Sequence, residues 1–533
     1  MKLLVVAPKT SLTIEQLSEA QRWYGFKSLH APHALAQLAA LTPSTHEVCW
    51  VDQSVGQVVD FQADVDVVVF VAAFEQLSPL SYLAGRFRAR KVPTALAGSF
   101  VSAHPGRVDM VDHKLIGPLE TVWPLFLQQF SAGVRERVFR GPALESLHDL
   151  PAPRWDAFPL SAYRMGTVEV VRELGPLDPD SLEEGRTGRL YQAAARVVEQ
   201  VETLAQQGMR RIHLAGPDLL ASVPQGLSVL QALAAWNAAR KRPVKFEAHI
   251  SLNGVKSDEV LRILVAAHVR RVVLPLNAPE PAQPESHETL LQAAESVRRM
   301  LAHGIRVAGR LYLGRAIDDA RALEEQVALA RDGGAILWPR VAKTLPGTPL
   351  YERLKAQGRV FASMREARLD ILLLDAPNFK LPFVDKEGFL AQLRSLLQTA
   401  YSPLSLELRL RKLYEEAEQY PPRGAWLELE DVQALLLCMA GTLKHPEEAR
   451  LEQVARAVAL TAVLRPHPRL WSQGLEQVIE EAATRSYVLK TLHEQPLDSE
   501  VPEQSFKQKL VGMGARLVGK LGPKSPVKQA SEA

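Results

Sequence analysis

The stretch V-D-V-V-V-F-V-A at residues 65–72 predicts a β-strand that is buried on both faces. It is rich in β-branched residues and lacks the polar alternation of a half-exposed strand, a pattern typical of parallel sheets. Further strand signals occur at residues 3–7, 46–52, 93–97 and 114–117, and they alternate with helical signals at 31–41, at 80–90 and up to residue 130. This alternation predicts a doubly wound, Rossmann-like parallel sheet over residues 1–140.

The composition is that of an ordinary globular protein. The chain has 533 residues, which is enough for two or three domains. Its 63 basic and 60 acidic residues give a net charge of +3, which offers no argument for nucleic-acid binding. Two cysteines do not make a disulfide framework, so we expect a cytoplasmic protein. The apolar run at residues 3–7 is too short for a signal peptide and is predicted to be the first buried strand.

A second series of βα units follows a Pro-rich linker at residues 141–160. The predicted strands lie at residues 211–215, 245–250, 271–276, 307–313 and 336–341, and the predicted helices at 189–207, 226–240, 258–267, 287–303 and 319–331. Repeats with this period predict a partial TIM-type βα barrel over residues 161–360. Polar residues at its strand ends include Asp218, His249 and Asn277. His213 and His249 do not form a recognisable metal-binding spacing, and we expect no metal site.

The C-terminal part of the chain is predicted to be helical. We expect a helical cap at residues 361–420, a small helical domain at 421–495 and a basic tail at 496–533. Within the tail, apolar residues recur at helical spacing between basic ones over residues 505–521. Such a basic amphipathic helix could lie on an anionic membrane surface; the alternative is a frayed basic tail, since glycines weaken the helix.

Several motifs, in this order and spacing, resemble the radical S-adenosylmethionine (SAM) enzymes that carry an N-terminal cobalamin-binding domain. The motifs are A-P-H-A-L-A-Q-L-A-A (31–40), A-G-S-F-V-S (97–102), I-G-P-L-E (116–120), G-M-R-R-I-H-L-A-G-P-D (208–218), L-Y-L-G (311–314) and T-L-P-G-T-P-L-Y-E-R-L (344–354). The resemblance covers about residues 1–410. It implies a cobalamin-binding domain at 1–140 and a radical SAM-like barrel at 161–360.

The resemblance also implies a cobalamin site at the strand ends of the first domain. Its candidate residues are Ala72, Phe74, Gly98, Ser99, Ser102, Gly117 and Glu120. Small residues there let the backbone approach a flat ligand, whereas the alternative is that the glycines only form strand-to-helix turns. The D-x-H-x-x-G motif of a cobalamin-ligating histidine is absent. His30 and His33 lie nearby, and we expect them at a helix start, on the surface or as satisfied core residues.

The chain departs from this family at the cluster. The family holds a [4Fe-4S] cluster on C-x3-C-x2-C, whereas Leu174, Asp178 and Ser181 occupy the corresponding positions here. Iron–sulfur clusters need several thiolate ligands, and Cys49 and Cys438 are far apart in sequence. We therefore expect no cluster and no SAM cleavage, and we interpret Asp218, His249 and Asn277 as a vestigial SAM pocket.

These observations leave three functional hypotheses, and none of them assigns a catalytic residue. The first is a degenerate relative, a pseudoenzyme that binds cobalamin or another small ligand, or acts as a scaffolding partner of an active radical SAM paralogue. The second is a cobalamin-dependent methyltransferase that works without a cluster, because a corrin carries methyl-transfer chemistry itself. The third is a membrane-surface adaptor that uses residues 505–521.

Overall fold

The computed structural model describes most of residues 1–413 and the segment 471–493. The residues left out are 10–19, 74–75, 104, 175–187, 278–286, 317, 320, 322–323, 329–332, 345–348, 362–376, 403–404, 406–407, 411, 414–470 and 494–533. Phe74, Asp178, Ser181, most of the predicted helical domain and the predicted amphipathic tail therefore lie outside the described residues.

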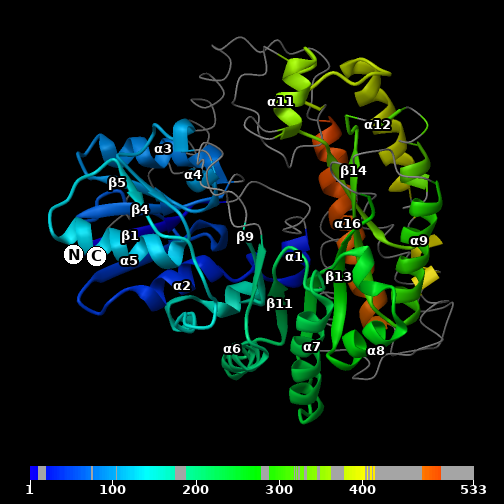
Figure 1. Cartoon of the computed structure of the whole chain (residues 1–533), viewed down its shortest axis with the longest axis horizontal. Helices are drawn as coiled ribbons and strands as arrows, with labels where there is room; N and C mark the ends of the chain where they lie inside the picture. The colour runs from blue at the N-terminus through cyan, green and yellow to red at the C-terminus, as the bar shows by residue number, and fades with distance from the viewer. Residues whose placement is uncertain are drawn as a thin grey trace, which may run out of the picture. The chain divides into compact units, whose positions relative to one another are not determined.

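The N-terminal part of the chain forms a parallel sheet, as predicted (Figure 1). The sheet has six strands, and the last of them, at residues 138–140, is not among the five predicted. In spatial order its strands are β3 (Glu47–Asp52), β1 (Lys2–Ala7), β4 (Val67–Val71), β5 (Thr94–Ala97), β6 (His113–Ile116) and β7 (Val138–Arg140). Helices α2 (His33–Leu41) and α5 (Leu119–Ser131) pack on one face, and α3 (Leu77–Arg88) and α4 (Ser99–Ala103) on the other. Because both faces are covered, the central strand β4 is apolar throughout.

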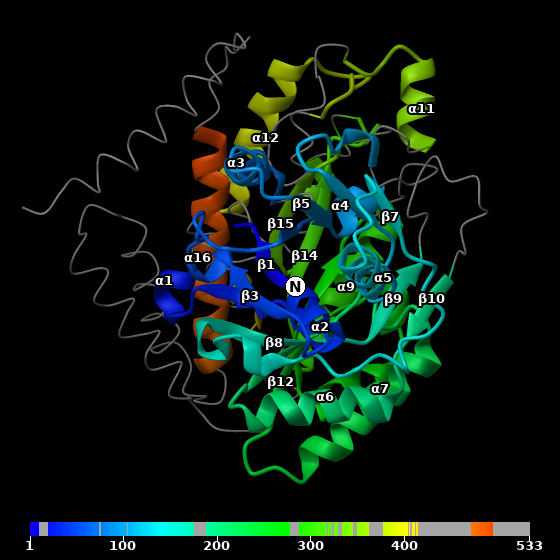
Figure 2. The ribbon, with the colours of Figure 1, turned by 90° about the vertical axis from the view of Figure 1, so that its left-hand side faces the viewer.

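A second parallel sheet has seven strands and curls into a half-barrel. In spatial order its strands are β15 (Ile336–Val341), β14 (Arg306–Leu313), β13 (Val269–Pro275), β12 (Lys245–His249), β11 (Arg211–Ala215), β8 (Tyr163–Glu169) and β2 (Ser28–His30). Helices α6 (Ala194–Gln206), α7 (Val223–Ala238), α8 (Asp258–Ala266) and α9 (His287–Ala302) cover its outer face (Figures 1 and 2). The partial barrel predicted from the βα period is thus present.

Two strands of this sheet do not follow from the sequence pattern. β8 lies directly after the predicted linker, and β2 comes from the first 30 residues and pairs with β8 through Ser28 and His30. His30 is therefore on a strand, and its predicted position at a helix start is wrong. The short antiparallel hairpin of β9 (Val171–Leu174) and β10 (Gly188–Tyr191) also replaces the beginning of the helix predicted at 189–207.

The predicted Pro-rich linker is packed into the structure. Trp155, Phe158 and Leu160 are all buried and belong to the main hydrophobic core. Gln37 on α2 donates a hydrogen bond to the carbonyl oxygen of Pro151, at 3.1 Å. The proline content of this segment therefore reflects a fixed extended path over the core rather than a free spacer.

Three helices are described after the half-barrel sheet: α11 (Pro349–Ala356), α12 (Lys386–Ala400) and α16 (Trp471–His493). α16 falls within the predicted helical domain at 421–495, but its buried side chains join the main core together with residues of the half-barrel. Among the described helices, none has both the length and the apolar character needed to cross a bilayer.

Candidate functional site

The glycines at the carboxyl edge of the six-stranded sheet are required by chain packing. Gly98 has φ 116°, and a Cβ atom on it would lie 2.5 Å from the carbonyl oxygen of Ala72. Gly117 has φ 117°, and its Cβ would lie 3.0 Å from the carbonyl oxygen of Gly141. Both positions therefore need glycine with or without a ligand.

The polar side chains predicted at this edge are held by the protein. The Ser102 hydroxyl accepts a hydrogen bond from the backbone N–H of Gly117 at 3.1 Å. Glu120, at the start of α5, forms a bidentate ion pair with Arg172 of β9, at 2.8 and 2.7 Å. Burial alone would raise the pKa of Glu120, but Arg172 outweighs it and lowers this pKa below its ordinary value.

Ala72 directly follows β4 and is buried, and Ser99, the first residue of α4, is exposed. The strand order places the switch point beside β1, where doubly wound sheets bind ligands outside the carboxyl ends of their strands. Ala72, Gly98 and Ser99 therefore place only small side chains, or none, at this edge.

The predicted residues at the barrel mouth tie strand ends together. Asp218 follows β11, and its Oδ1 accepts hydrogen bonds from the backbone N–H groups of Leu220 and Ser251, both at 3.0 Å. Asn277 follows β13, donates to the carbonyl oxygen of Tyr312 and accepts from its N–H, both at 2.8 Å. His249, the last residue of β12, packs its ring against that of His213, with ring centroids 5.3 Å apart.

The residues present do not fit a cysteine-ligated [4Fe-4S] cluster. Leu174 is the last residue of β9 and pairs with Gly188 in the hairpin. Cys49 is exposed on β3 of the six-stranded sheet, and Cys438 lies outside the described residues. Two cysteines in the whole sequence cannot supply the three thiolates of the family's motif.

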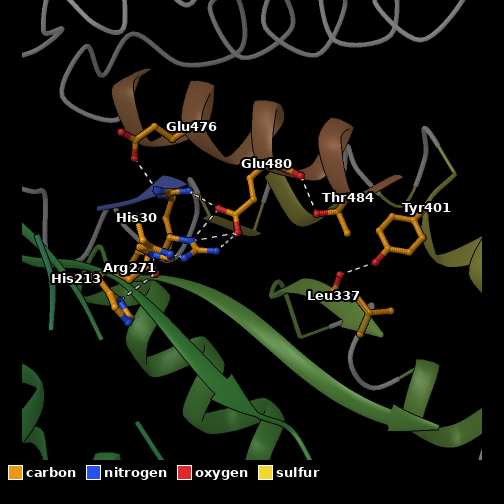
Figure 3. Close-up of polar contacts among 10 residues, drawn as sticks. His30, His213, Arg271, Leu337, Tyr401, Glu476, Glu480 and Thr484 are labelled. Carbon is orange, nitrogen blue, oxygen red and sulfur yellow. Dashed lines mark hydrogen bonds and ion pairs between the residues drawn. The ribbon is translucent and has the colours of Figure 1, made fainter. Parts of the chain in front are cut away.

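A cluster of ionisable side chains lies inside the half-barrel instead (Figure 3). His213 of β11 and Glu247 of β12 are register partners in the parallel sheet, so their side chains leave the same face. His213 Nδ1 lies 3.5 Å from Glu247 Oε1, and His30 Nε2, from the edge strand β2, lies 3.8 Å from the same oxygen. The imidazole rings of His30 and His213 are 4.7 Å apart.

The other carboxylate oxygen of Glu247 is taken by Arg271. This arginine stands on β13 beside Glu247, and its Nη1 forms an ion pair with Glu247 Oε2. Burial would raise the pKa of Glu247, but Arg271 and the two histidines outweigh it and hold this pKa well below its ordinary range. Burial also lowers the pKa of His30. At neutral pH the cluster therefore contains a carboxylate anion facing a neutral His30 imidazole.

α16 covers this inner face and carries the countercharges (Figure 3). Glu476 forms ion pairs with three arginines: Arg164 at 3.5 Å, Arg306 at 2.6 Å, and Arg211. Glu480 binds Arg271, and it binds Arg306 at 3.1 Å. Burial would raise the pKa of Glu476, but Arg211 and Arg306 lower it well below its ordinary range. The helix is therefore fixed to β8, β11, β13 and β14 by buried charge pairs.

The sequence pattern does not predict this cluster, because its members come from segments far apart in the chain. One signal was available: β11 (R-I-H-L-A) and β12 (K-F-E-A-H) alternate polar and apolar residues. In a sheet covered by helices on one side, period-two alternation indicates a second face that is polar. It did not indicate that α16 would cover that face.

Comparison with known proteins gives relatives at low identity. No family model matches the chain. Hopanoid C-2 methylase of Rhodopseudomonas palustris (strain TIE-1) is 23% identical over 408 residues, which covers 74% of this chain and 75% of that protein. An uncharacterized methyltransferase of Synechocystis sp. is 22% identical over 378 residues, covering 68% of this chain and 69% of that protein.

Solved structures give the same architecture. The radical SAM methyltransferase TsrM from Kitasatospora setae, with cobalamin and a [4Fe-4S] cluster bound, superposes with a TM-score of 0.54 at 17% identity and covers 78% of this chain and 99% of that one. The cobalamin-dependent SAM radical enzyme OxsB, with aqua-cobalamin and SAM bound, gives a TM-score of 0.54 at 12% identity and covers 98% and 82%. The α/β fold of this chain, with its parallel sheet and its curled half-barrel, is the fold of the cobalamin-dependent radical SAM enzymes.

Proposed function

We propose that this chain binds a corrinoid at the carboxyl edge of its six-stranded sheet and takes part in methyl transfer without a cysteine-ligated cluster. The observation that carries the proposal is the extent of the match to hopanoid C-2 methylase. It spans 408 residues and about three quarters of both chains, so it cannot rest on either domain alone. The second relative is also a methyltransferase by its name.

This chain lacks the three cysteines that would hold a cluster for radical cleavage of SAM. Reductive cleavage of SAM needs cluster iron, and the sequence contains only Cys49 and Cys438. We therefore infer that this chain does not split SAM to a radical. A methylated corrinoid supplies a cobalt-bound methyl group that can be transferred to a nucleophile without a cluster.

The residues of this chain would hold and shield the corrinoid. Ala72 contributes only a methyl group and Gly98 no side chain at this edge, and the exposed Ser99 follows Gly98 at the start of α4. The ion pair of Glu120 and Arg172 joins the helix after β6 to the hairpin that follows β8. This pair fixes the carboxyl edges of the two sheets against each other, a precondition for holding one ligand at both.

Corrinoid binding is tested with hydroxocobalamin. The purified chain is mixed with an excess, freed of unbound ligand by gel filtration, and examined by visible absorbance for one corrinoid per chain. A Ser99→Trp substitution fills the edge from an exposed position, and we expect it to weaken binding at least about tenfold, equivalent to about 1.4 kcal/mol. Ser131→Trp is the matched control. Ser131 is also exposed, but it is the last residue of α5, and α5 begins at the carboxyl edge, so Ser131 lies away from the proposed site.

A colourless wild-type chain after this treatment would refute the proposed corrinoid site. Equal binding by the Ser99→Trp and wild-type proteins would place the corrinoid elsewhere. Anaerobic reconstitution with iron and sulfide tests the second part of the proposal. We expect no stoichiometric cluster and no 5′-deoxyadenosine from SAM, and the formation of both would overturn it.

The position of α16 favours a second candidate function, that of a partner protein without catalysis of its own. This helix covers the inner face of the half-barrel through Glu476 and Glu480, on the side where an open barrel would receive a substrate. A chain closed in this way would act as a corrinoid-binding or scaffolding partner of an active radical SAM paralogue. Loss of methylcobalamin absorbance on addition of acceptor extracts favours methyl transfer. Co-elution with such a paralogue, with no loss of the methyl group, favours the scaffolding role.

A further inference from the structure

We propose that His30, His213 and Glu247 form a binding site for one divalent transition-metal ion inside the half-barrel, with Zn²⁺ as the expected metal. The proposal is independent of corrinoid binding, because these residues lie on β2, β11 and β12 and not at the carboxyl edge of the six-stranded sheet.

The geometry of the three side chains is that of a site which needs only a small contraction to bind an ion. One ligand atom from each residue lies within 4.8 Å of the other two. Both histidine nitrogens approach the same atom, Glu247 Oε1, at 3.8 and 3.5 Å. These distances are too long for hydrogen bonds. Ligand atoms bonded to Zn²⁺ at about 2.0–2.2 Å stand somewhat closer together, so these two distances would have to shorten only slightly.

Two buried nitrogen atoms in the cluster have no hydrogen-bond partner in the protein. They are His30 Nε2 and His213 Nδ1, the same two atoms that face Glu247. An unsatisfied buried polar atom costs about 1–3 kcal/mol, and such atoms call for a specific explanation. A metal ion between the two nitrogens and Oε1 would satisfy all three atoms at once.

The residue types also match the chemistry of the ion. Two imidazoles and one carboxylate are a known ligand set for Zn²⁺ and leave a fourth tetrahedral position open. Ligating carboxylates are themselves usually held by an outer partner. Arg271 plays that part here, since it binds Glu247 Oε2 and leaves Oε1 to face the histidines. Its charge is shared with Glu480 of α16, so it is not a free cation beside the site.

The test uses the full-length chain after removal of metals by a chelator. Co²⁺ is titrated in as a spectroscopic probe, and we expect visible ligand-field absorption that saturates at one ion per chain and disappears when Zn²⁺ is added. Loss of an outer-shell partner of a metal ligand typically weakens metal affinity by about 10–100-fold. Loss of a ligand itself should cost at least the upper figure, so we expect His213→Gln, His30→Gln and Glu247→Gln each to weaken Co²⁺ binding by at least about 100-fold.

The matched control is His33→Gln. His33 lies three residues from His30 but packs beside Trp155, with ring centroids 6.1 Å apart, and should leave Co²⁺ binding unchanged. Circular dichroism confirms that each variant is folded, and the conservative Glu247→Gln change keeps an oxygen for Arg271. A folded wild-type chain that does not bind Co²⁺ overturns the proposal, as does unchanged binding in both histidine variants. Corrinoid binding by the same samples is read separately, so failure of one site is distinguishable from failure of the other.

Discussion

The two parallel sheets of this chain are stabilised in different ways. The six-stranded sheet has apolar cores on both faces, and its central strand β4 is buried throughout. The half-barrel sheet packs apolar residues against α6–α9, whereas its inner face also carries His213, Glu247, Arg271 and Arg306. Burial of apolar area stabilises the six-stranded sheet whichever apolar helix covers it. The half-barrel sheet needs a covering helix whose charges match those of its inner face. α16 is that helix.

The largest effect is expected from breaking this charge match. Glu476→Ala removes the carboxylate that binds Arg164, Arg211 and Arg306. These three buried arginines then lose this countercharge. Removing one partner of a buried pair costs about 4 kcal/mol. We expect a large drop in the midpoint of thermal unfolding and release of α16, measured by limited proteolysis near residue 471. A drop no larger than that of a surface variant would contradict the comparison.

The corresponding change in the six-stranded sheet is Leu96→Ala. Leu96 lies on β5, is fully buried and packs in the core toward α3 and α4. The lost contacts and the cavity should cost about 3 kcal/mol. Because no charge is involved, this loss should be independent of salt and of pH between 5 and 8 in denaturant unfolding. A strong salt dependence would show that the two sheets do not differ as proposed.

Acid should act on the half-barrel through His268. Burial, with Arg270 and Lys245 nearby, lowers the pKa of His268 to about 4. The unfolded chain has a pKa near 6.5 and binds the proton first, so stability falls as the pH drops from about 6.5 to 4 and is unaffected above that window. At pH 5 the His268→Asn variant should have a free energy of unfolding about 1 kcal/mol higher, relative to the wild type, than it has at pH 8. The gain is no larger because His268 is only partly buried and solvent screens its charge.

Comparison of pH 5 with pH 8 separates the titration of His268 from the effect of the substitution on the backbone. His268 has φ 64°, a left-handed conformation that asparagine adopts more easily, and that gain does not depend on pH. An equal gain at both pH values would assign the whole effect to the backbone and exclude the titration.

The smallest effect is expected at an exposed pair. Glu295 and Arg298 stand one turn apart on α9, at 2.8 Å, and both side chains are about half exposed. Glu295→Ala should change the free energy of unfolding by less than about 0.5 kcal/mol, because exposed ion pairs are screened by solvent. The contrast with Glu476→Ala in the same thermal assay isolates the effect of burial from that of charge.

Much of this fold could be predicted from the sequence, because buried parallel strands have continuous apolar runs. The strands at 211–215 and 336–341 begin and end at the predicted residues, and β1, β4 and β5 differ by one or two. β2 could not be predicted in the same way, since three residues at a sheet edge carry no periodicity. The interior cluster could not be predicted for a related reason, because His30, His213 and Glu247 are brought together only by the tertiary structure.

The edge strand β2 has a consequence for how this protein can be divided. Its residues belong to the N-terminal domain by sequence but complete the sheet of the following one, where Ser28 and His30 pair with Tyr163 and Met165. Thr167 on β8 also donates a hydrogen bond to the carbonyl oxygen of Ala31, at 3.0 Å. A fragment that starts after residue 140 would therefore leave β8 as a bare edge, open to pairing with other chains. Truncation between the domains should produce aggregation rather than two separable halves.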